Sequence, residues 1–235
     1  MTDEAFKTKN VVLVHGAFAD GSSWSGVVDF LQAAGLHVVA IQNPLTSLKE
    51  DIETTKRALA MQNGPTVLVG HSYGGTVISE VGVDPKVTGL VYVAALAPEP
   101  GEDVSPTGKL TMQFLPTPPA GASIHPTNGF AQFDEKGFIE NFAPDVPPCR
   151  ARVLAVSQGP IAQDLFDQKT TVAAWKQKPS WYAVSTKDRV IHPDLERFFA
   201  KRMNAYTVEV DASHASPVSQ PSAIAELIEL AARGV

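Results

Sequence analysis

Two repeating patterns of hydrophobic and polar positions alternate along most of the chain. Short apolar runs rich in β-branched residues, such as "VVLVHG" at 11–16 and "TVLVG" at 66–70, are typical of strands that are buried on both faces of a sheet. Between these runs, apolar residues such as Trp24, Val27 and Leu31 recur at helical spacing. The pattern therefore predicts strands that alternate with helices.

The same patterns continue on both sides of a central interruption. Strands are also predicted at 36–44, 86–96, 180–186 and 205–213, and helices at 22–34, 47–64, 74–81, 193–203 and 221–234. Strands that alternate with helices of this length pair in parallel through right-handed crossovers. We therefore expect an α/β fold with a doubly wound, mostly parallel sheet, whose ligand site lies at the carboxyl ends of the strands.

The alternation stops between residues 98 and 179. This segment holds 12 of the chain's 18 prolines, which disfavour central strands. We expect short helices and loops here, forming a cap or lid insertion over the carboxyl ends of the strands. The predicted organisation is an α/β core of residues 1–97 and 180–235, interrupted by the insertion at 98–179.

Composition and charge narrow the class of protein. The 235 residues are 44% hydrophobic and 19% charged, as in an ordinary globular protein, and the net charge is −6 without a basic run, so no nucleic-acid partner is expected. The amino terminus lacks a signal-peptide pattern and no apolar run could span a bilayer, so we expect a cytoplasmic protein with no membrane partner. The single cysteine, Cys149, and the histidine spacing give no reason to expect a metal site. Whether the chain is a monomer or a homodimer is left open.

The stretch "VGHSYGG" places Ser72 in the pattern G-x-S-x-G, with a predicted strand before it and a predicted helix after it. Such a turn could simply require small residues. In this context, however, the pattern is typical of a nucleophile elbow, which exposes a serine hydroxyl above the edge of a sheet. We therefore interpret Ser72 as a catalytic nucleophile.

A serine nucleophile requires a histidine base and a carboxylate that orients the histidine. His214 follows the last predicted strand, where its ring could reach a serine on another strand end. Asp188 follows the preceding strand and is our candidate for the acid, with Asp211 as its rival. Glu209 is predicted to lie within a strand and Asp194 to begin a helix, so we disfavour both.

An oxyanion hole requires backbone N–H groups near the nucleophile. We expect one from Tyr73, directly after the serine, and another from the loop "HGAFADGSSW" after the first strand. Ala17 is the expected donor in that loop, with Phe18 as the alternative. The insertion supplies candidates for an apolar pocket roof: Phe114, Phe130, Phe133, Phe138 and Phe142.

The segments "VVLVHGAFADGSSW", "VLVGHSYGG", "YAVSTKDRVI" and "VDASHA" together resemble the α/β-hydrolase superfamily. The resemblance is to small bacterial esterase-like members akin to plant methylesterases and hydroxynitrile lyases, and it extends over nearly the whole chain. It implies that Ser72 is the nucleophile, His214 the base and Asp188 the acid, with Ala17 and Tyr73 as the oxyanion donors.

Departures from the lyase patterns favour ester hydrolysis. S-selective hydroxynitrile lyases of this family carry a lysine after the catalytic histidine, where this chain has Ala215. R-selective lyases carry an asparagine in the first-strand loop, where this chain has Gly16 and Ala17. We therefore predict a cofactor-free, carboxylesterase-type serine hydrolase acting on small carboxylic esters. A lyase-like C–C bond lyase and a small-molecule receptor that retains the triad remain as alternatives.

Overall fold

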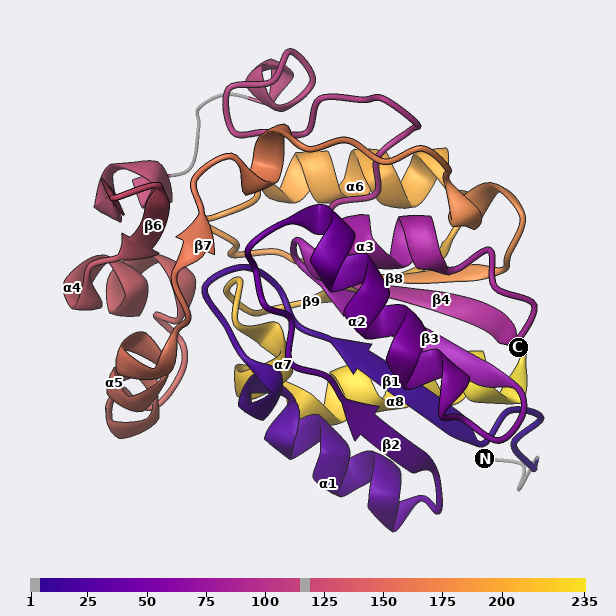
Figure 1. The fold of residues 1–235 in the computed structure, drawn as a ribbon. Helices are drawn as coiled ribbons and strands as arrows, with labels where there is room; N and C mark the ends of the chain where they lie inside the picture. The colour runs from indigo at the N-terminus through magenta and orange to yellow at the C-terminus, as the bar shows by residue number, and fades with distance from the viewer. Residues whose placement is uncertain (1–4, 115–118) are drawn as a thin grey trace.

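A sheet of six parallel strands forms the centre of the protein. The computed structural model describes residues 5–114 and 119–235, so the first four residues of the expected core and residues 115–118 of the expected insertion lie outside the description. The strands are β1 (Asn10–Val14), β2 (His37–Ala40), β3 (Thr66–His71), β4 (Val87–Val93), β8 (Ser180–Ser185) and β9 (Tyr206–Val210). Their order is β2-β1-β3-β4-β8-β9, and every neighbouring pair is parallel, which confirms the predicted fold class (Figure 1).

Helices cover both faces of this sheet. On one face lie α1 (Ser25–Ala33), which follows a 3-10 turn, and α8 (Pro221–Arg233); on the other lie α2 (Leu48–Ala60), α3 (Gly74–Val81) and α6 (Pro193–Arg202) (Figure 1). Successive strand residues contribute to separate cores on the two faces. Val12 and Leu68 belong to the core on the α2–α3 side, whereas Val11 and Val67 belong to the core on the α1–α8 side. Burial on both faces explains why the strands appear in the sequence as continuous apolar runs.

The segment between β4 and β8 contains short elements, gathered largely to one side of the central sheet (Figure 1). Its helices are α4 (Glu135–Gly137), which continues into a π-helical turn at Phe138–Phe142, and α5 (Pro148–Ser157). It also contains an antiparallel sheet of β5 (Ile124–Thr127), β6 (Phe130–Phe133) and β7 (Ile161–Ala162), which our expectation of helices and loops omitted. Pro126 is compatible with β5 because β5 is an edge strand, where a missing N–H is tolerated.

The parallel arrangement sets the position of the connecting loops. The carboxyl ends of β1, β3, β8 and β9 lie at one edge of the sheet, so the loops that follow them emerge there together. A further short helix, α7 (Ser216–Ser219), follows the loop after β9. Within residues 5–114 and 119–235, none of the helices has the length and hydropathy needed to cross a bilayer.

Candidate active site

Ser72 occupies the sharp turn between β3 and α3. Its φ of +54° is a left-handed conformation that costs a non-glycine residue about 1–3 kcal/mol and persists only where the surroundings enforce it. The Ser72 N–H donates to the Val93 carbonyl at 3.1 Å, and its carbonyl accepts from the Gly75 N–H at 2.9 Å. Gly74 is a steric requirement, because a Cβ there would lie 2.5 Å from the Val14 carbonyl oxygen. The turn is therefore held by β1 and β4, the neighbours of β3.

His214 joins the serine to a carboxylate. Its Nε2 lies 2.8 Å from Ser72 Oγ, and its Nδ1 lies 2.5 Å from Asp188 Oδ2. The imidazole is completely buried, so these contacts occur away from bulk water. Because a carboxylate only accepts hydrogen bonds, Nδ1 carries the proton and Nε2 presents a lone pair to the serine hydroxyl. This is the arrangement in which a histidine can act as a base toward Ser72.

Backbone amides hold the Asp188 carboxylate in place. Its Oδ1 accepts from the N–H groups of Val190 at 2.6 Å and Ile191 at 2.9 Å, which leaves Oδ2 facing His214. The rival acid, Asp211, lies on the surface and pairs with Lys187.

The other two acids weighed from the sequence are also engaged elsewhere. Asp194 and Glu209 both form ion pairs with Arg197. Of the four carboxylates considered, Asp188 is the one that reaches His214. The difference arises because the loop after β8 turns its backbone N–H groups around Asp188, whereas the side chains of the other three point toward solvent.

His71, the residue before Ser72 in the G-H-S-Y-G turn, contacts the base His214. The His71 ring lies 4.8 Å from the His214 ring, and its Nε2–H donates to the His214 carbonyl at 2.8 Å. Burial, and then the proximity of His214, holds the pKa of His71 well below its usual range, so the ring is neutral at physiological pH. His71 therefore fixes the backbone of the base without adding a second charge.

The insertion also holds the loop that carries His214. The Ser213 N–H donates to Asp145 Oδ2 at 2.9 Å, and the Ala215 N–H donates to the Phe142 carbonyl at 3.1 Å. The Phe142 ring packs edge-on against the His214 imidazole, with 4.8 Å between the ring centres. Our sequence reasoning missed both Asp145 and the anchoring by His71, because no local pattern marks such long-range contacts.

The loop after β1 passes directly beside the serine. A Cβ on Gly16 would lie 2.6 Å from Ser72 Cβ, so only glycine permits this approach. His15 sets the loop by donating from Nδ1 to the Gly16 carbonyl at 2.8 Å and accepting at Nε2 from the Asn43 N–H at 2.8 Å. Burial lowers the pKa of His15, consistent with this neutral form. Within the described residues, the Ala17 N–H has no backbone or side-chain acceptor.

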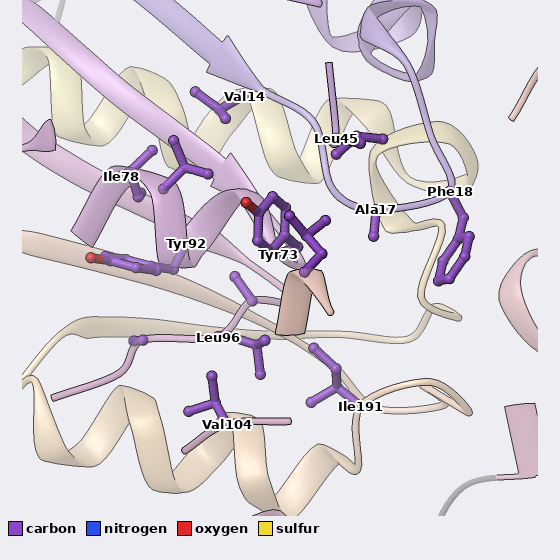
Figure 2. Close-up of a cluster of buried hydrophobic side chains, with 14 of the residues drawn as sticks. Val14, Ala17, Phe18, Leu45, Tyr73, Ile78, Tyr92, Leu96, Val104 and Ile191 are labelled. Atoms are coloured by element: carbon purple, nitrogen blue, oxygen red, sulfur yellow. The ribbon is translucent and has the colours of Figure 1, made fainter. Parts of the chain in front are cut away.

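The Tyr73 side chain lies within a cluster of buried hydrophobic residues (Figure 2). Its hydroxyl donates to Asp51 Oδ2 at 2.8 Å, while Asp51 Oδ1 accepts from the Leu45 N–H at 2.9 Å. Burial raises the pKa of Asp51 to about 6. The Tyr73 N–H, like that of Ala17, finds no acceptor within residues 5–114 and 119–235. Both expected oxyanion donors thus have an N–H group without an acceptor among the described residues.

An apolar cavity of about 110 Å³ opens onto Ser72 and His214. Ala17, Phe18 and Leu96 contribute to its wall from the core, and Figure 2 shows them facing the same region as Ile191 and Val104. The described residues contain no group of three or more His, Cys, Asp or Glu side chains arranged to hold a metal ion.

The aromatic residues of the insertion divide into lining and supporting groups. Phe114 and Phe142 line the cavity, together with Phe166, which our sequence reasoning did not include. Phe133 and Phe138 pack against Phe142 instead and are buried. The remaining candidate, Phe130, is 40% exposed and does not contribute to the cavity wall.

Comparison with known proteins gives relatives in sequence and in structure. The chain is 27% identical to the alpha/beta hydrolase nvfD of Aspergillus novofumigatus, over 94% of this chain and 96% of the relative. It is 35% identical to a carbendazim hydrolyzing esterase of a Nocardioides species, over 40% of this chain and 45% of that enzyme. The crystal structure of a pyrethroid hydrolase from Sphingobium faniae superposes with a TM-score of 0.79 at 25% identity, covering 96% of this chain and 98% of the other. Residues 11–227 match the alpha/beta hydrolase family, and the chain belongs to that family.

Proposed function

We propose that this protein is a serine hydrolase that cleaves small, apolar carboxylic esters through an acyl-enzyme intermediate. One observation carries the proposal: His214 lies between Ser72 Oγ and Asp188 Oδ2, at 2.8 Å and 2.5 Å, beside an apolar cavity. Family relatives that include an esterase and a pyrethroid hydrolase support the same class of reaction. The reaction needs no cofactor, because side chains and backbone N–H groups supply every required group.

In the first half of the reaction, His214 Nε2 takes the proton of the Ser72 hydroxyl as Oγ attacks the ester carbonyl carbon. The carbonyl oxygen becomes an oxyanion, and we propose that it binds the N–H groups of Ala17 and Tyr73. The tetrahedral intermediate then breaks its bond to the alcohol oxygen. That oxygen takes the proton from His214 and leaves as the free alcohol, while the acyl group remains on Ser72.

In the second half, a water molecule replaces the alcohol. His214 takes one proton from the water, the hydroxide attacks the acyl carbon, and the second tetrahedral intermediate expels Ser72 Oγ. Ser72 recovers its proton from His214, and the carboxylic acid is released. Throughout both halves, the Asp188 carboxylate keeps the His214 ring in the tautomer that presents Nε2 to the serine and stabilises the imidazolium.

The lining of the cavity favours a small and neutral substrate. Apart from His192 and His214, its described lining contains no ionisable side chain, so a charged acyl or alcohol group would lose its hydration without gaining a charged partner. The insertion supplies half of the wall, through residues that include Phe114, Phe142 and Phe166. We accordingly propose that residues 98–179 act as a cap that selects the substrate, while residues 1–97 and 180–235 carry the reacting groups.

A series of p-nitrophenyl esters of increasing acyl length tests the proposal. We expect repeated turnover of short and medium chains, a decline once the acyl chain exceeds the cavity, and no turnover of acyl groups that end in a carboxylate. Hydrolysis that persists at the wild-type rate in Ser72→Ala would contradict the mechanism.

Two other outcomes would indicate different functions. A single burst of product, equal to the enzyme concentration and followed by no turnover, would indicate a receptor that retains its product. Release of cyanide from mandelonitrile that depends on Ser72 would indicate a lyase. We expect neither, because Ala215 stands where S-selective lyases carry lysine and the loop at Gly16 and Ala17 lacks the asparagine of R-selective lyases.

A further inference from the structure

A second carboxyl group is buried behind the acid of the site. Glu196 lies on α6, is completely buried, and places its carboxyl beside that of Asp188. Its Oε2 accepts from the Ser185 N–H at 2.9 Å. Its Oε1 has no hydrogen-bond partner within residues 5–114 and 119–235, although water cannot reach it. A buried oxygen without a partner is uncommon in folded proteins and requires an explanation.

The hydrogen bonds of Asp188 supply that explanation. An ionised carboxylate offers about four lone-pair sites. Three of them are filled by the N–H groups of His214, Val190 and Ile191. One site is left to accept a further donor. A proton on Glu196 Oε1 would fill this site and, at the same time, give Oε1 its missing partner.

We propose that Glu196 is a neutral carboxylic acid that donates a hydrogen bond from Oε1 to Asp188. This bond would add Glu196 to the series of hydrogen bonds that joins Ser72, His214 and Asp188. The inference rests on the proposed role of Asp188 as the acid. It makes Glu196 a positioning residue, because Glu196 acts on the reaction through Asp188 and is not one of the residues that line the cavity.

The surroundings of Glu196 favour its neutral form. Burial raises the pKa of Glu196 well above its usual range, and the adjacent Asp188 raises it further. The other titratable groups that face it are Tyr182 and Arg197. The Tyr182 hydroxyl is itself neutral and donates to a backbone carbonyl, while the Arg197 guanidinium forms its ion pairs on the exposed side of α6, with Glu209 among its partners. Arg197 opposes the increase in the pKa of Glu196 but does not contact its carboxyl.

The donated bond changes what Asp188 presents to His214. A hydrogen bond to an ionised carboxylate stabilises it and draws part of its negative charge away from the imidazole. Without the donor, the full charge of Asp188 would favour the protonated form of His214. The rise of kcat/KM with pH on the acid side of the profile, its acid limb, would then move to higher pH. More alkaline conditions would be needed to remove the proton from His214 Nε2.

Two substitutions separate this positioning role from packing. Glu196→Gln keeps an oxygen for the Ser185 N–H and an N–H donor for Asp188, but cannot ionise. Glu196→Met has a similar length and provides neither group. We expect Glu196→Gln to retain kcat within about threefold and to leave the acid limb in place. Glu196→Met should lose roughly 10- to 100-fold in kcat with little change in KM, and its acid limb should move to higher pH.

Two kinetic outcomes would overturn the proposal. Equal impairment of both variants would show that an ionised carboxylate or the size of the side chain matters, and wild-type kinetics in Glu196→Met would show that the donor has no effect. The melting temperature of each variant separates loss of folding from loss of positioning.

Infrared spectroscopy tests the protonation state directly. Among the described residues, the other carboxyl with a raised pKa is Asp51, which has a pKa of about 6 and is ionised at about pH 8. At that pH the wild-type spectrum should contain the carbonyl band of one protonated carboxylic acid. We expect this band to be absent from Glu196→Gln and present in Ser72→Ala. If Glu196→Gln lost a carboxylate band instead of the acid band, Glu196 would be ionised in the wild type and the proposal would be wrong. Because this measurement does not depend on ester hydrolysis, its outcome is independent of whether the proposed function is correct.

Discussion

The parallel-sheet core and the insertion contribute different things to the site. In the core, Ser72 and Asp188 sit at strand ends, and backbone hydrogen bonds fix both. In the insertion, Phe114 and Phe166 contribute apolar surface to the cavity wall from short turns and the loops between them. We infer that chemistry and substrate selection are largely separable in this protein. Substitutions of Ser72 and Asp188 in the core should lower kcat, whereas substitutions of Phe114 and Phe166 in the insertion should mainly change KM.

Among the substitutions that test this separation, Ser72→Ala should have the largest effect. Loss of the attacking hydroxyl should lower kcat by about 10⁴-fold or more, because the remaining site can only bind and polarise the ester. Steady-state hydrolysis of a short p-nitrophenyl ester measures the effect, with circular dichroism as the control for folding. Activity within tenfold of the wild type in a folded variant would rule out Ser72 as the nucleophile. An organophosphate adduct found by mass spectrometry on another residue would count equally against it.

Asp188→Asn should have the next largest effect. An amide at this position favours the wrong tautomer of His214 and cannot stabilise the imidazolium, so kcat should fall by several thousandfold, close to the roughly 10⁴-fold seen for such substitutions. The matched control is Asp211→Asn, whose carboxylate pairs with Lys187 at the surface and should change kcat by less than about twofold. The reverse ranking would assign the role to Asp211.

The next prediction concerns the pH dependence of the stability of the core, which should reflect the buried carboxyl of Asp51. Burial raises the pKa of Asp51 from 3.8 to about 6, so between these values the folded protein holds a proton that the unfolded chain has released. The free energy of unfolding therefore falls as the pH rises through this window, and Asp51→Asn removes the dependence. Relative to Asp51→Asn, the wild type should lose up to about 3 kcal/mol between acid and neutral pH.

Urea unfolding of both proteins at several pH values measures this difference. Parallel stability curves for the wild type and Asp51→Asn would show that Asp51 titrates normally. As a control on the insertion, Asp134→Asn should not reproduce the effect, because hydrogen bonds lower the pKa of this partly exposed carboxylate and its contribution to stability has the opposite sign.

Among the effects on catalysis, the smallest is expected for Phe114→Ala in the insertion, with Phe130→Ala as its control. Phe114→Ala removes a ring from the cavity wall and should raise KM for a medium-chain ester by roughly tenfold, with kcat within about twofold. Phe130→Ala removes an exposed ring that does not contribute to the wall and should change neither constant. A drop in kcat without a change in KM for Phe114→Ala would show that the insertion takes part in the chemistry.

The core was predictable because its elements are locally encoded. Strands buried on both faces require continuous apolar runs, and all six were located to within a few residues. The helix predicted to begin at Gly74 does begin there, as α3. The 3-10 turn at Gly21–Trp24, where we had expected a regular helix to begin, shows the usual uncertainty at helix ends. The three-stranded sheet of the insertion escaped prediction because its strands are two to four residues long and β7 pairs with β6 from a distant segment. The turn between β5 and β6 was a local signal that we missed, because Asn128-Gly129 is typical of a two-residue hairpin.

The site was predictable to the extent that its groups follow strand ends. Ser72 lies in a short pattern whose neighbours are dictated by steric contacts, and His214 and Asp188 follow the last two strands of the sheet. The supporting groups are different. Glu196 and His71 act through contacts with Asp188 and with the His214 carbonyl, and no spacing along the chain distinguishes them from ordinary buried residues.

The contacts between the insertion and the His214 loop limit how freely this protein can be remodelled. Asp145 and Phe142 come from the insertion but hold Ser213 and Ala215, the two residues that flank the base. A chimera that replaced the insertion with that of a relative would therefore alter the substrate wall and also release the backbone on both sides of His214. Directed evolution of new substrate ranges should accordingly vary Phe114 and Phe166, which contact the cavity, and leave the stretch from Phe142 to Asp145 intact.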